Sequence, residues 1–213
     1  MVKLSASILS CDYLNLEDDI KRLEKAGCNM LHLDVMDGNF VPNISFGMPV
    51  IKSIRKHTEM VLDVHLMIDK PHRYIEDFAK CADILGFHYE AGSDNIATLK
   101  KIRELGIKNC ITIKPNTKPS EIFDLLPYCD MVLVMSVEPG FGGQSFIPGA
   151  LDKISEISAE CKRRGLNIDI EVDGGINAQT APLAIKAGAT VLVAGSYVFS
   201  DNMEERVKGI ISL

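Results

Sequence analysis

The sequence has no excess of basic charge and no long apolar run, and each absence excludes a class of partner. Its 213 residues include 23 lysines and arginines against 29 aspartates and glutamates, a formal net charge of −6. A nucleic-acid-binding surface is typically basic, and a membrane-spanning helix needs about 20 consecutive apolar residues. We therefore expect neither a nucleic-acid partner nor a membrane span. An anionic small substrate stays compatible with this charge, because backbone N–H groups can bind a phosphate.

The cysteines also lack the spacing of a paired site. No two of the six form a C-x-x-C pair, and no signal-peptide pattern precedes the first strand-like segment. Cysteines of this kind are typical of reduced thiols inside the cell, so the sequence predicts a cytoplasmic protein. A linker and a low-complexity segment are absent as well, and residues 1–213 are expected to form a single catalytic domain.

What the chain does contain is one repeated unit, a short β-rich run followed by an amphipathic helical stretch. The apolar, often β-branched runs predict buried parallel strands at residues 3–7, 30–35, 61–66, 84–88, 109–113, 131–135, 168–172 and 191–194. Eight such units in this length predict a closed (β/α)8 TIM barrel. The alternative is an open doubly wound sheet, which needs a glycine-rich loop after the first strand. Residues 7–12 contain no glycine.

Helical periodicity supports the same architecture. Apolar residues recur on one face in residues 16–25, 96–105 and 151–164, and Ser120 is expected to cap the start of a further helix. Glycines at the helix ends fit the left-handed C-cap position, namely Gly27, Gly106, Gly165 and Gly188.

Polar side chains gather where the predicted strands end. His32 and Asp34 are two residues apart, so both point to one side of their strand, and Asp63 and His65 repeat this spacing. Asp173 follows the seventh strand. Buried charges are costly unless they are paired or bound to a cation. The mixed imidazole and carboxylate set of His32, Asp34, His65 and Asp173 therefore predicts one divalent metal ion, with Zn, Fe, Mn and Co as the candidates. The alternative is a hydrogen-bonded core network.

Glycine-bearing loops follow the last three strands and predict a second subsite. They contain Gly140, Phe141, Gly142 and Gly143, then Gly174 and Gly175, then Gly195 and Ser196. Loops after strands 7 and 8 commonly hold phosphate in this fold, and glycine lets backbone N–H groups approach an anion closely. Ordinary turns are the alternative. The 140–143 loop is also a candidate lid.

Two further groups near the strand ends keep two interpretations each. Met36, Met67 and Met135 either fill gaps in the core or form a polarizable wall beside the reacting atoms. His88 and Glu90, at the end of the fourth strand, either orient the metal ligands or are structural.

At these residues the sequence resembles the ribulose-phosphate 3-epimerase family from end to end. The matching segments are residues 5–10 (SASILS), 31–38 (LHLDVMDG), 40–43 (FVPN), 63–67 (DVHLM), 135–144 (MSVEPGFGGQ) and 171–175 (EVDGG). The resemblance implies a barrel of the ribulose-phosphate-binding type. It also implies interconversion of D-ribulose 5-phosphate and D-xylulose 5-phosphate in the pentose phosphate pathway, through a cis-enediolate.

The resemblance also assigns roles to individual residues. It implies that Asp34 and Asp173 are the acid and base, and that both are metal ligands together with His32 and His65. The substrate contacts that it implies are Ser7, His65, Gly140, Phe141, Gly142, Gly143, Asp173, Gly174, Gly175, Gly195 and Ser196. A homo-oligomer is expected for a barrel enzyme of this size.

Inversion at one carbon needs a proton removed from one face and another delivered to the opposite face. Two carboxylic groups can do this when their surroundings separate their pKa values. Three alternatives stay open: a D-allulose-6-phosphate 3-epimerase, a decarboxylase or aldolase on the same barrel, and a noncatalytic sugar-phosphate-binding barrel. The decarboxylase or aldolase usually needs a lysine among the strand-end acids, which the second and third strand ends do not offer.

Overall fold

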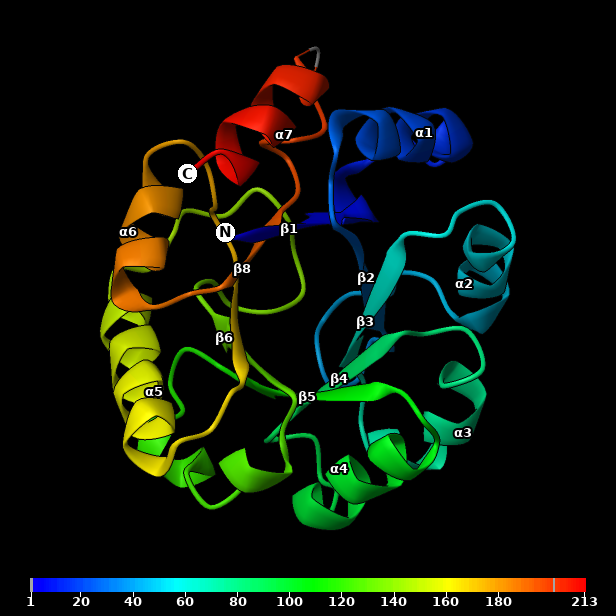
Figure 1. Ribbon diagram of the computed structural model, residues 1–213. Helices are drawn as coiled ribbons and strands as arrows, with labels where there is room; N and C mark the ends of the chain where they lie inside the picture. Colours follow the sequence, from blue (N-terminus) through cyan, green and yellow to red (C-terminus); the bar gives the residue numbers. More distant parts are fainter. Residues whose placement is uncertain (1, 201) are drawn as a thin grey trace.

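Eight parallel strands close into a barrel in a computed structural model that describes residues 2–200 and 202–213. The strands pair in chain order, with β1 closing the barrel against β8. Figure 1 shows the strands around a central axis with the helices outside them. The strands are β1 (Lys3–Ser7), β2 (Met30–Met36), β3 (Val61–Met67), β4 (Ile84–His88), β5 (Lys108–Ile113), β6 (Met131–Met135), β7 (Asp169–Asp173) and β8 (Val191–Ala194). The expected (β/α)8 barrel is therefore confirmed.

Seven α-helices cover the outside of the barrel in the described part of the chain. They are α1 (Leu16–Ala26), α2 (Met48–Arg55), α3 (Ile75–Phe78), α4 (Asn95–Glu104), α5 (Ala150–Arg164), α6 (Thr180–Ala187) and α7 (Met203–Ile211). Short 3₁₀ turns lie at Ile8–Ser10, Pro71–Arg73, Pro119–Ile122 and Leu126–Tyr128. Gly27, Gly165 and Gly188 take the left-handed conformation that ends α1, α5 and α6, as their positions in the sequence predict.

The segment between β5 and β6 differs from the prediction. Ser120 was expected to cap a helix, but it lies inside the 3₁₀ turn Pro119–Ile122, and a second 3₁₀ turn follows. Pro119 is compatible with a helix start, but Pro127 lacks the backbone N–H that an α-helix running on through this segment requires. The N–H of Lys118 is instead bound by the side chain of Glu121, at 2.9 Å.

Side chains point alternately outward and inward along each strand, so the protein has two separate apolar cores. Side chains such as Leu31 and Leu33 point outward and pack under the helices in the larger core. A smaller cluster that includes Met30, Met131 and Val191 fills the barrel interior. His32 and Asp34 lie between the outward leucines in sequence, so they share the interior side of β2.

The parallel arrangement brings the carboxyl ends of all eight strands to one face of the barrel. The polar strand ends predicted from the sequence therefore meet there. All six cysteines are free thiols, and Cys11 alone among them is not buried. Among the described residues, every helix is too short or too polar to cross a bilayer.

Candidate active site

A cleft opens at the carboxyl ends of the strands and gathers most of the predicted site residues. Its lining includes Asp34, Ser7, Gly140, Phe141, Gly142, Gly143, Asp173, Gly174, Gly175, Gly195 and Ser196. His32 and His65 are fully buried beneath it. Ser10, Glu138 and Gln144, which were not predicted as site residues, also line the cleft. Their signal was their place in segments 5–10 and 135–144, which carry the resemblance to the family.

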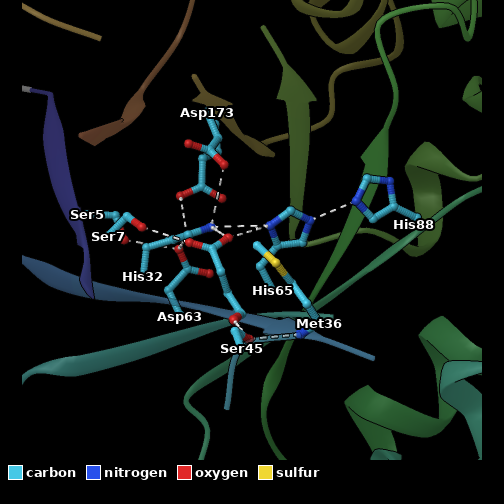
Figure 2. Close-up of polar contacts among 11 residues, drawn as sticks. Ser5, Ser7, His32, Met36, Ser45, Asp63, His65, His88 and Asp173 are labelled. Atoms are coloured by element: carbon cyan, nitrogen blue, oxygen red, sulfur yellow. Dashed lines mark hydrogen bonds and ion pairs between the residues drawn. The ribbon is translucent and has the colours of Figure 1, made fainter. Parts of the chain in front are cut away.

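At the base of the cleft four candidate ligand atoms converge. Nε2 of His32 lies 3.3 Å from Oδ1 of Asp34 and 3.9 Å from Oδ2 of Asp173. Nδ1 of His65 lies 3.3 Å from Nε2 of His32 and 3.2 Å from Oδ1 of Asp34. Figure 2 shows His65 between His32 and His88, with Asp173 above the cluster in this view. The cluster joins β2, β3 and β7, with β1 and β8 lying between β2 and β7.

The spacing of these atoms fits a metal ion. Tetrahedral coordination with metal–ligand bonds of about 2.0–2.1 Å places the ligand atoms roughly 3.3–3.4 Å from one another. Three of the four measured separations are 3.2–3.3 Å. The donor set of two imidazoles and two carboxylates suits Zn, Fe, Mn or Co. The residues present therefore fit the divalent ion that the sequence predicts.

A contact on the far side of the His32 ring determines which of its two nitrogens carries the hydrogen and which faces the cluster. Nδ1 of His32 lies 2.7 Å from Oδ2 of Asp63, which also accepts a hydrogen bond from Ser5 Oγ at 3.0 Å. A carboxylate there favours the proton on Nδ1 and leaves the lone pair of Nε2 directed at the cluster. Asp63 points to the same side of β3 as His65 and pairs in register with His32. It therefore lies one layer deeper in the barrel.

The two aspartates of the cluster experience opposite electrostatic effects. Burial alone would raise the pKa of Asp34, but the neighbouring His32 and His65 outweigh it and hold that pKa far below its usual value. Burial, with the negative charge of Asp34, raises the pKa of Asp173 to about 7. The Asp173 side chain is 18% exposed, whereas that of Asp34 is 4% exposed. One carboxyl is thus held ionised while the other can carry a proton near neutral pH.

Protonation of the imidazoles is coupled to the same charges. Burial would lower the pKa of His32, but Asp34 and Asp63 raise it well above the ordinary value. The pKa of His65 is lowered, first by burial, although its contact with Asp34 opposes this. Without a cation, a proton on His32 offsets the negative charge of the cluster.

Glu171 is a buried acid of the barrel interior to which the sequence analysis gave no role. It lies on β7 two residues before Asp173, and its Oε1 is 3.8 Å from Nδ1 of His32. Burial, followed by the charge of Asp63, raises its pKa well above the ordinary value. The missed signal was its spacing, because residues i and i+2 share one side of a strand.

The other end of the cleft is shaped by close backbone approaches. Gly175 has φ +65°, and a Cβ there would lie 2.4 Å from the backbone N of Phe146. Gly174 has φ +124°, and a Cβ there would lie 2.5 Å from Val137. The loops after β6 and β7 are therefore in contact through backbone that only glycine permits. Their surface continues outward along Gly143 and Ser196.

The three methionines singled out in the sequence all reach this cleft. Met36, Met67 and Met135 are each at most 4% exposed and line its wall. Met36 and Met67 also pack against Val41, which belongs to the loop after β2. Both interpretations of these residues fit this position.

The closed parallel barrel, with its polar side chains gathered at the carboxyl ends of the strands, places this protein among the (β/α)8-barrel enzymes. Residues 3–199 match the model of the Ribulose-phosphate 3 epimerase family. The chain belongs to this family of epimerases, as its motifs predict.

Named relatives match almost the whole chain. The ribulose-phosphate 3-epimerase of Bacillus subtilis (strain 168) is 46% identical over 212 residues, which cover 99% of this chain and 97% of that protein. The ribulose-phosphate 3-epimerase of Synechocystis sp. is 46% identical over 98% of this chain and 93% of its own length. The chloroplastic ribulose-5-phosphate-3-epimerase of Arabidopsis thaliana is also 46% identical, over 97% of this chain and 75% of that protein.

More distant solved structures share the fold. A 3-hexulose-6-phosphate synthase superposes with a TM-score of 0.72 at 16% identity, covering 99% of this chain and 98% of the other. A thiamine phosphate pyrophosphorylase from Pyrococcus furiosus gives a TM-score of 0.67 at 14% identity, covering 99% and 94%. At such identities the likeness shows the barrel alone.

Proposed function

We propose that this chain interconverts D-ribulose 5-phosphate and D-xylulose 5-phosphate at C3, in keeping with the names of its relatives. The observation that carries the proposal is the pair formed by Asp34 and Asp173. Both carboxylates open into one cleft, and their pKa values are shifted in opposite directions. A pair with separated pKa values supplies one group to take a proton and another to give one.

The proton transfers follow from this pair. Asp34, ionised, removes the C3 proton from one face of the sugar, and Asp173, protonated, delivers a proton to the other face of the resulting cis-enediolate. In the reverse direction the two roles exchange. Ser7 Oγ donates a hydrogen bond to Oδ2 of Asp34 at 2.7 Å, which orients that carboxylate within the cleft.

One divalent ion, Zn, Fe, Mn or Co, would be held by His32, Asp34, His65 and Asp173. When bound, it supplies Lewis-acid stabilisation for negative charge that develops on the sugar oxygens. Burial of both histidines keeps bulk water away from this end of the cleft, where electrostatic effects are strongest.

The phosphate end of the substrate is assigned to the glycine loops. Gly143, Gly175 and Ser196 line both the cleft and its outward continuation, and backbone N–H groups in such loops bind phosphate without a basic side chain. Phe141 is 54% exposed at the rim, a position from which the 140–143 loop can cover a bound sugar. Holding the phosphate fixes which carbon lies beside the two aspartates.

The two-acid scheme is tested with Asp34→Asn and Asp173→Asn, each assayed for epimerisation and for exchange of the C3 proton in D2O. Each variant should lose epimerisation by at least ~10²-fold. Each should keep exchange from one epimer alone, and the retained epimer should differ between the two variants. Metal content is measured in parallel, because both residues are proposed ligands. Asp124→Asn, at a side chain that is 99% exposed, is the matched control. Near-normal epimerisation in either site variant would rule the scheme out.

The identity of the sugar is tested by assaying D-ribulose 5-phosphate against D-allulose 6-phosphate, with and without a chelator. The proposal expects the higher kcat/KM for the pentose and loss of activity on chelation, restored by one of the four metals. A preference for the hexulose would assign the sister activity. Absence of turnover and of exchange with either sugar would leave a noncatalytic binding barrel.

We further propose that the chain forms a homo-oligomer and acts in the cytoplasm. Leu14 is 94% exposed and Ile44 is 75% exposed. Their near neighbours Tyr13 and Phe46 are in contact, with ring centroids 6.1 Å apart, so the two segments lie side by side, and contiguous apolar surface is common at subunit interfaces. Light scattering after gel filtration gives the mass, and a mass near that of one chain would contradict the first proposal. The six free thiols support a reducing compartment. Localisation of the tagged protein in its native cell tests the second.

A further inference from the structure

His88 is a fully buried histidine that the proposed reaction does not use. It ends β4, and its Nε2 lies 2.9 Å from Nε2 of His65. The two ring planes differ by 27°, and the contact between the two Nε2 atoms has the geometry of a hydrogen bond. The ring of Phe40 packs against His88, with centroids 4.8 Å apart. Figure 2 shows His88 beyond His65 on the side away from His32.

Glu90 lies on the other side of His88. Its Oε2 is 3.4 Å from Nδ1 of His88, and both atoms are buried with no hydrogen-bond partner among the described residues. The second carboxylate oxygen, Oε1, accepts hydrogen bonds from Lys114 N at 3.0 Å and from Thr117 Oγ1. The carboxylate is therefore held with one oxygen facing His88.

Residues 114–117, which bind the carboxylate of Glu90, are in turn held by a lysine of helix α5. Lys153 Nζ donates to the carbonyl oxygens of Lys114, at 3.1 Å, and of Thr117, at 2.5 Å. Nζ also donates to the carbonyl oxygen of Pro115, and an ammonium group that binds three carbonyls of one turn holds that turn in place. Glu90 thus has a defined place rather than a freely rotating one.

A hydrogen bond between the two Nε2 atoms needs one hydrogen, carried by one ring or by the other. If His88 donated to His65, Nδ1 of His88 would present a lone pair to the carboxylate, and two acceptors would face each other. If His65 donates, Nδ1 of His88 carries a hydrogen toward Glu90, and both nitrogens of His88 face a group of the complementary kind. In this second arrangement Nδ1 of His65 keeps its lone pair, which faces Nε2 of His32 at 3.3 Å and the carboxylate of Asp34 at 3.2 Å. The contact with Asp34 then has no hydrogen between its two atoms, and a cation would offset their repulsion.

We propose that Glu90 and His88 are positioning residues that fix His65 in the Nε2–H tautomer, so that its Nδ1 is available to a metal ion. The inference rests on the proposed metal site and extends it. Asp63 fixes the tautomer of His32 by direct contact, whereas Glu90 acts on His65 through an intervening imidazole. Partners of this kind typically alter metal affinity by about 10- to 100-fold.

Glu90→Gln tests the relay without a change of volume. The amide oxygen of the glutamine must accept from Lys114 N and Thr117, which turns the NH2 group toward Nδ1 of His88. His88 must then donate to His65, and Nδ1 of His65 carries a hydrogen toward the cluster. The expected result is a loss of Co²⁺ affinity of at least about tenfold, measured by chelator competition with the visible absorption of cobalt as readout.

His88→Gln is the control that distinguishes an effect of Glu90 passing through His88 from a structural role of Glu90. A glutamine at position 88 can accept from Nε2 of His65 whatever lies at position 90, so its Co²⁺ affinity should stay within about threefold of wild type. In that background Glu90→Gln should cost less than about threefold. A non-additive pair of this kind is the signature of direct coupling. His88→Phe removes the acceptor altogether and should resemble Glu90→Gln.

The tautomer can also be observed without metal. The chain has five histidines, so long-range ¹⁵N–¹H correlation of ¹⁵N-histidine-labelled protein is assignable with single His→Gln variants. We expect hydrogen on Nε2 of His65 in wild type and on Nδ1 in Glu90→Gln. His57→Gln, at an exposed position, should change neither this spectrum nor the affinity.

The outcomes separate the inference from the proposed function. Equal Co²⁺ affinity in wild type, Glu90→Gln and His88→Phe, with native thermal unfolding, would overturn the positioning role and leave the metal site intact. The same loss from Glu90→Gln in both the wild-type and the His88→Gln background would also overturn it, because the effect would then not pass through His88. No binding of Co²⁺ by wild type would overturn the metal site, and the positioning role with it.

Discussion

Replacing Gly175 by alanine gives a sharp test of how the phosphate end of the cleft is built. The residue has φ +65°, and a Cβ there would lie 2.4 Å from the backbone N and 2.8 Å from Cα of Phe146. The left-handed conformation costs a residue with a Cβ about 1–2 kcal/mol. The contact with Phe146 involves backbone, so the loop after β6 must move away for the distance to reach the ordinary 3.4 Å.

The expected loss of stability is the sum of two costs, the left-handed backbone conformation and the close contact with Phe146. Overpacking of this kind costs about 1–3 kcal/mol, so the total loss of stability should be about 2–5 kcal/mol. For a chain of this length each kcal/mol lowers Tm by about 2–4 °C. Because a misplacement of about 1 Å can cost ~10²-fold in rate, KM for the ketose phosphate should rise at least ~10-fold.

Two glycines elsewhere separate conformational strain from the contact itself. Gly106 has φ +84°, and a Cβ added there would meet nothing within 4 Å, so Gly106→Ala reports the cost of the backbone conformation alone. Gly209 lies in α7 and also has open space within 4 Å of an added Cβ, and Gly209→Ala should be neutral or stabilising by roughly 0.5–1 kcal/mol. Both variants should keep the wild-type KM.

The assay combines thermal unfolding with steady-state kinetics on the phosphorylated ketose. Gly175→Ala should lose more Tm than Gly106→Ala, and it alone should raise KM. If Gly175→Ala and Gly106→Ala shift Tm equally and leave KM unchanged, the close approach of the two loops does not shape the binding site, and the reasoning fails.

Three further results are expected. Binding of a divalent ion at pH 7 should release more than one proton, because the metal-free pKa of His32 is well above its usual value and that of Asp173 is about 7. Affinity should therefore fall as pH falls through this range, and titration calorimetry that shows no buffer dependence would contradict this. Ser196→Asp should raise KM at least ~10-fold with little change in kcat, since a carboxylate repels phosphate; an unchanged KM would argue against the phosphate position. In the native protein Ellman's reagent should modify Cys11 first and slowly, because burial raises its pKa to about 12 while the other cysteines are buried; rapid modification of several thiols would contradict this burial.

Local sequence patterns predict the barrel and the residues at the carboxyl ends of its strands. Apolar runs separated by helical periodicity predict the eight strands, and four of them, including β1 and β8, agree with the structure at both ends. The two-residue spacing of His32 and Asp34 requires a shared side of β2. The helix expected from Ser120 is the exception, since Pro127 interrupts that segment and it forms two 3₁₀ turns instead.

The sequence by itself determined which side of each strand the polar residues take, because side-chain direction depends on the backbone of one strand. Tertiary structure alone decided their depth and their partners. The register of β2 against β3 pairs His32 with Asp63 and Asp34 with His65, and closure of the barrel brings Asp173 within 3.9 Å of His32. The opposite pKa shifts of the two aspartates depend on burial and on charges from other strands, which no local pattern encodes.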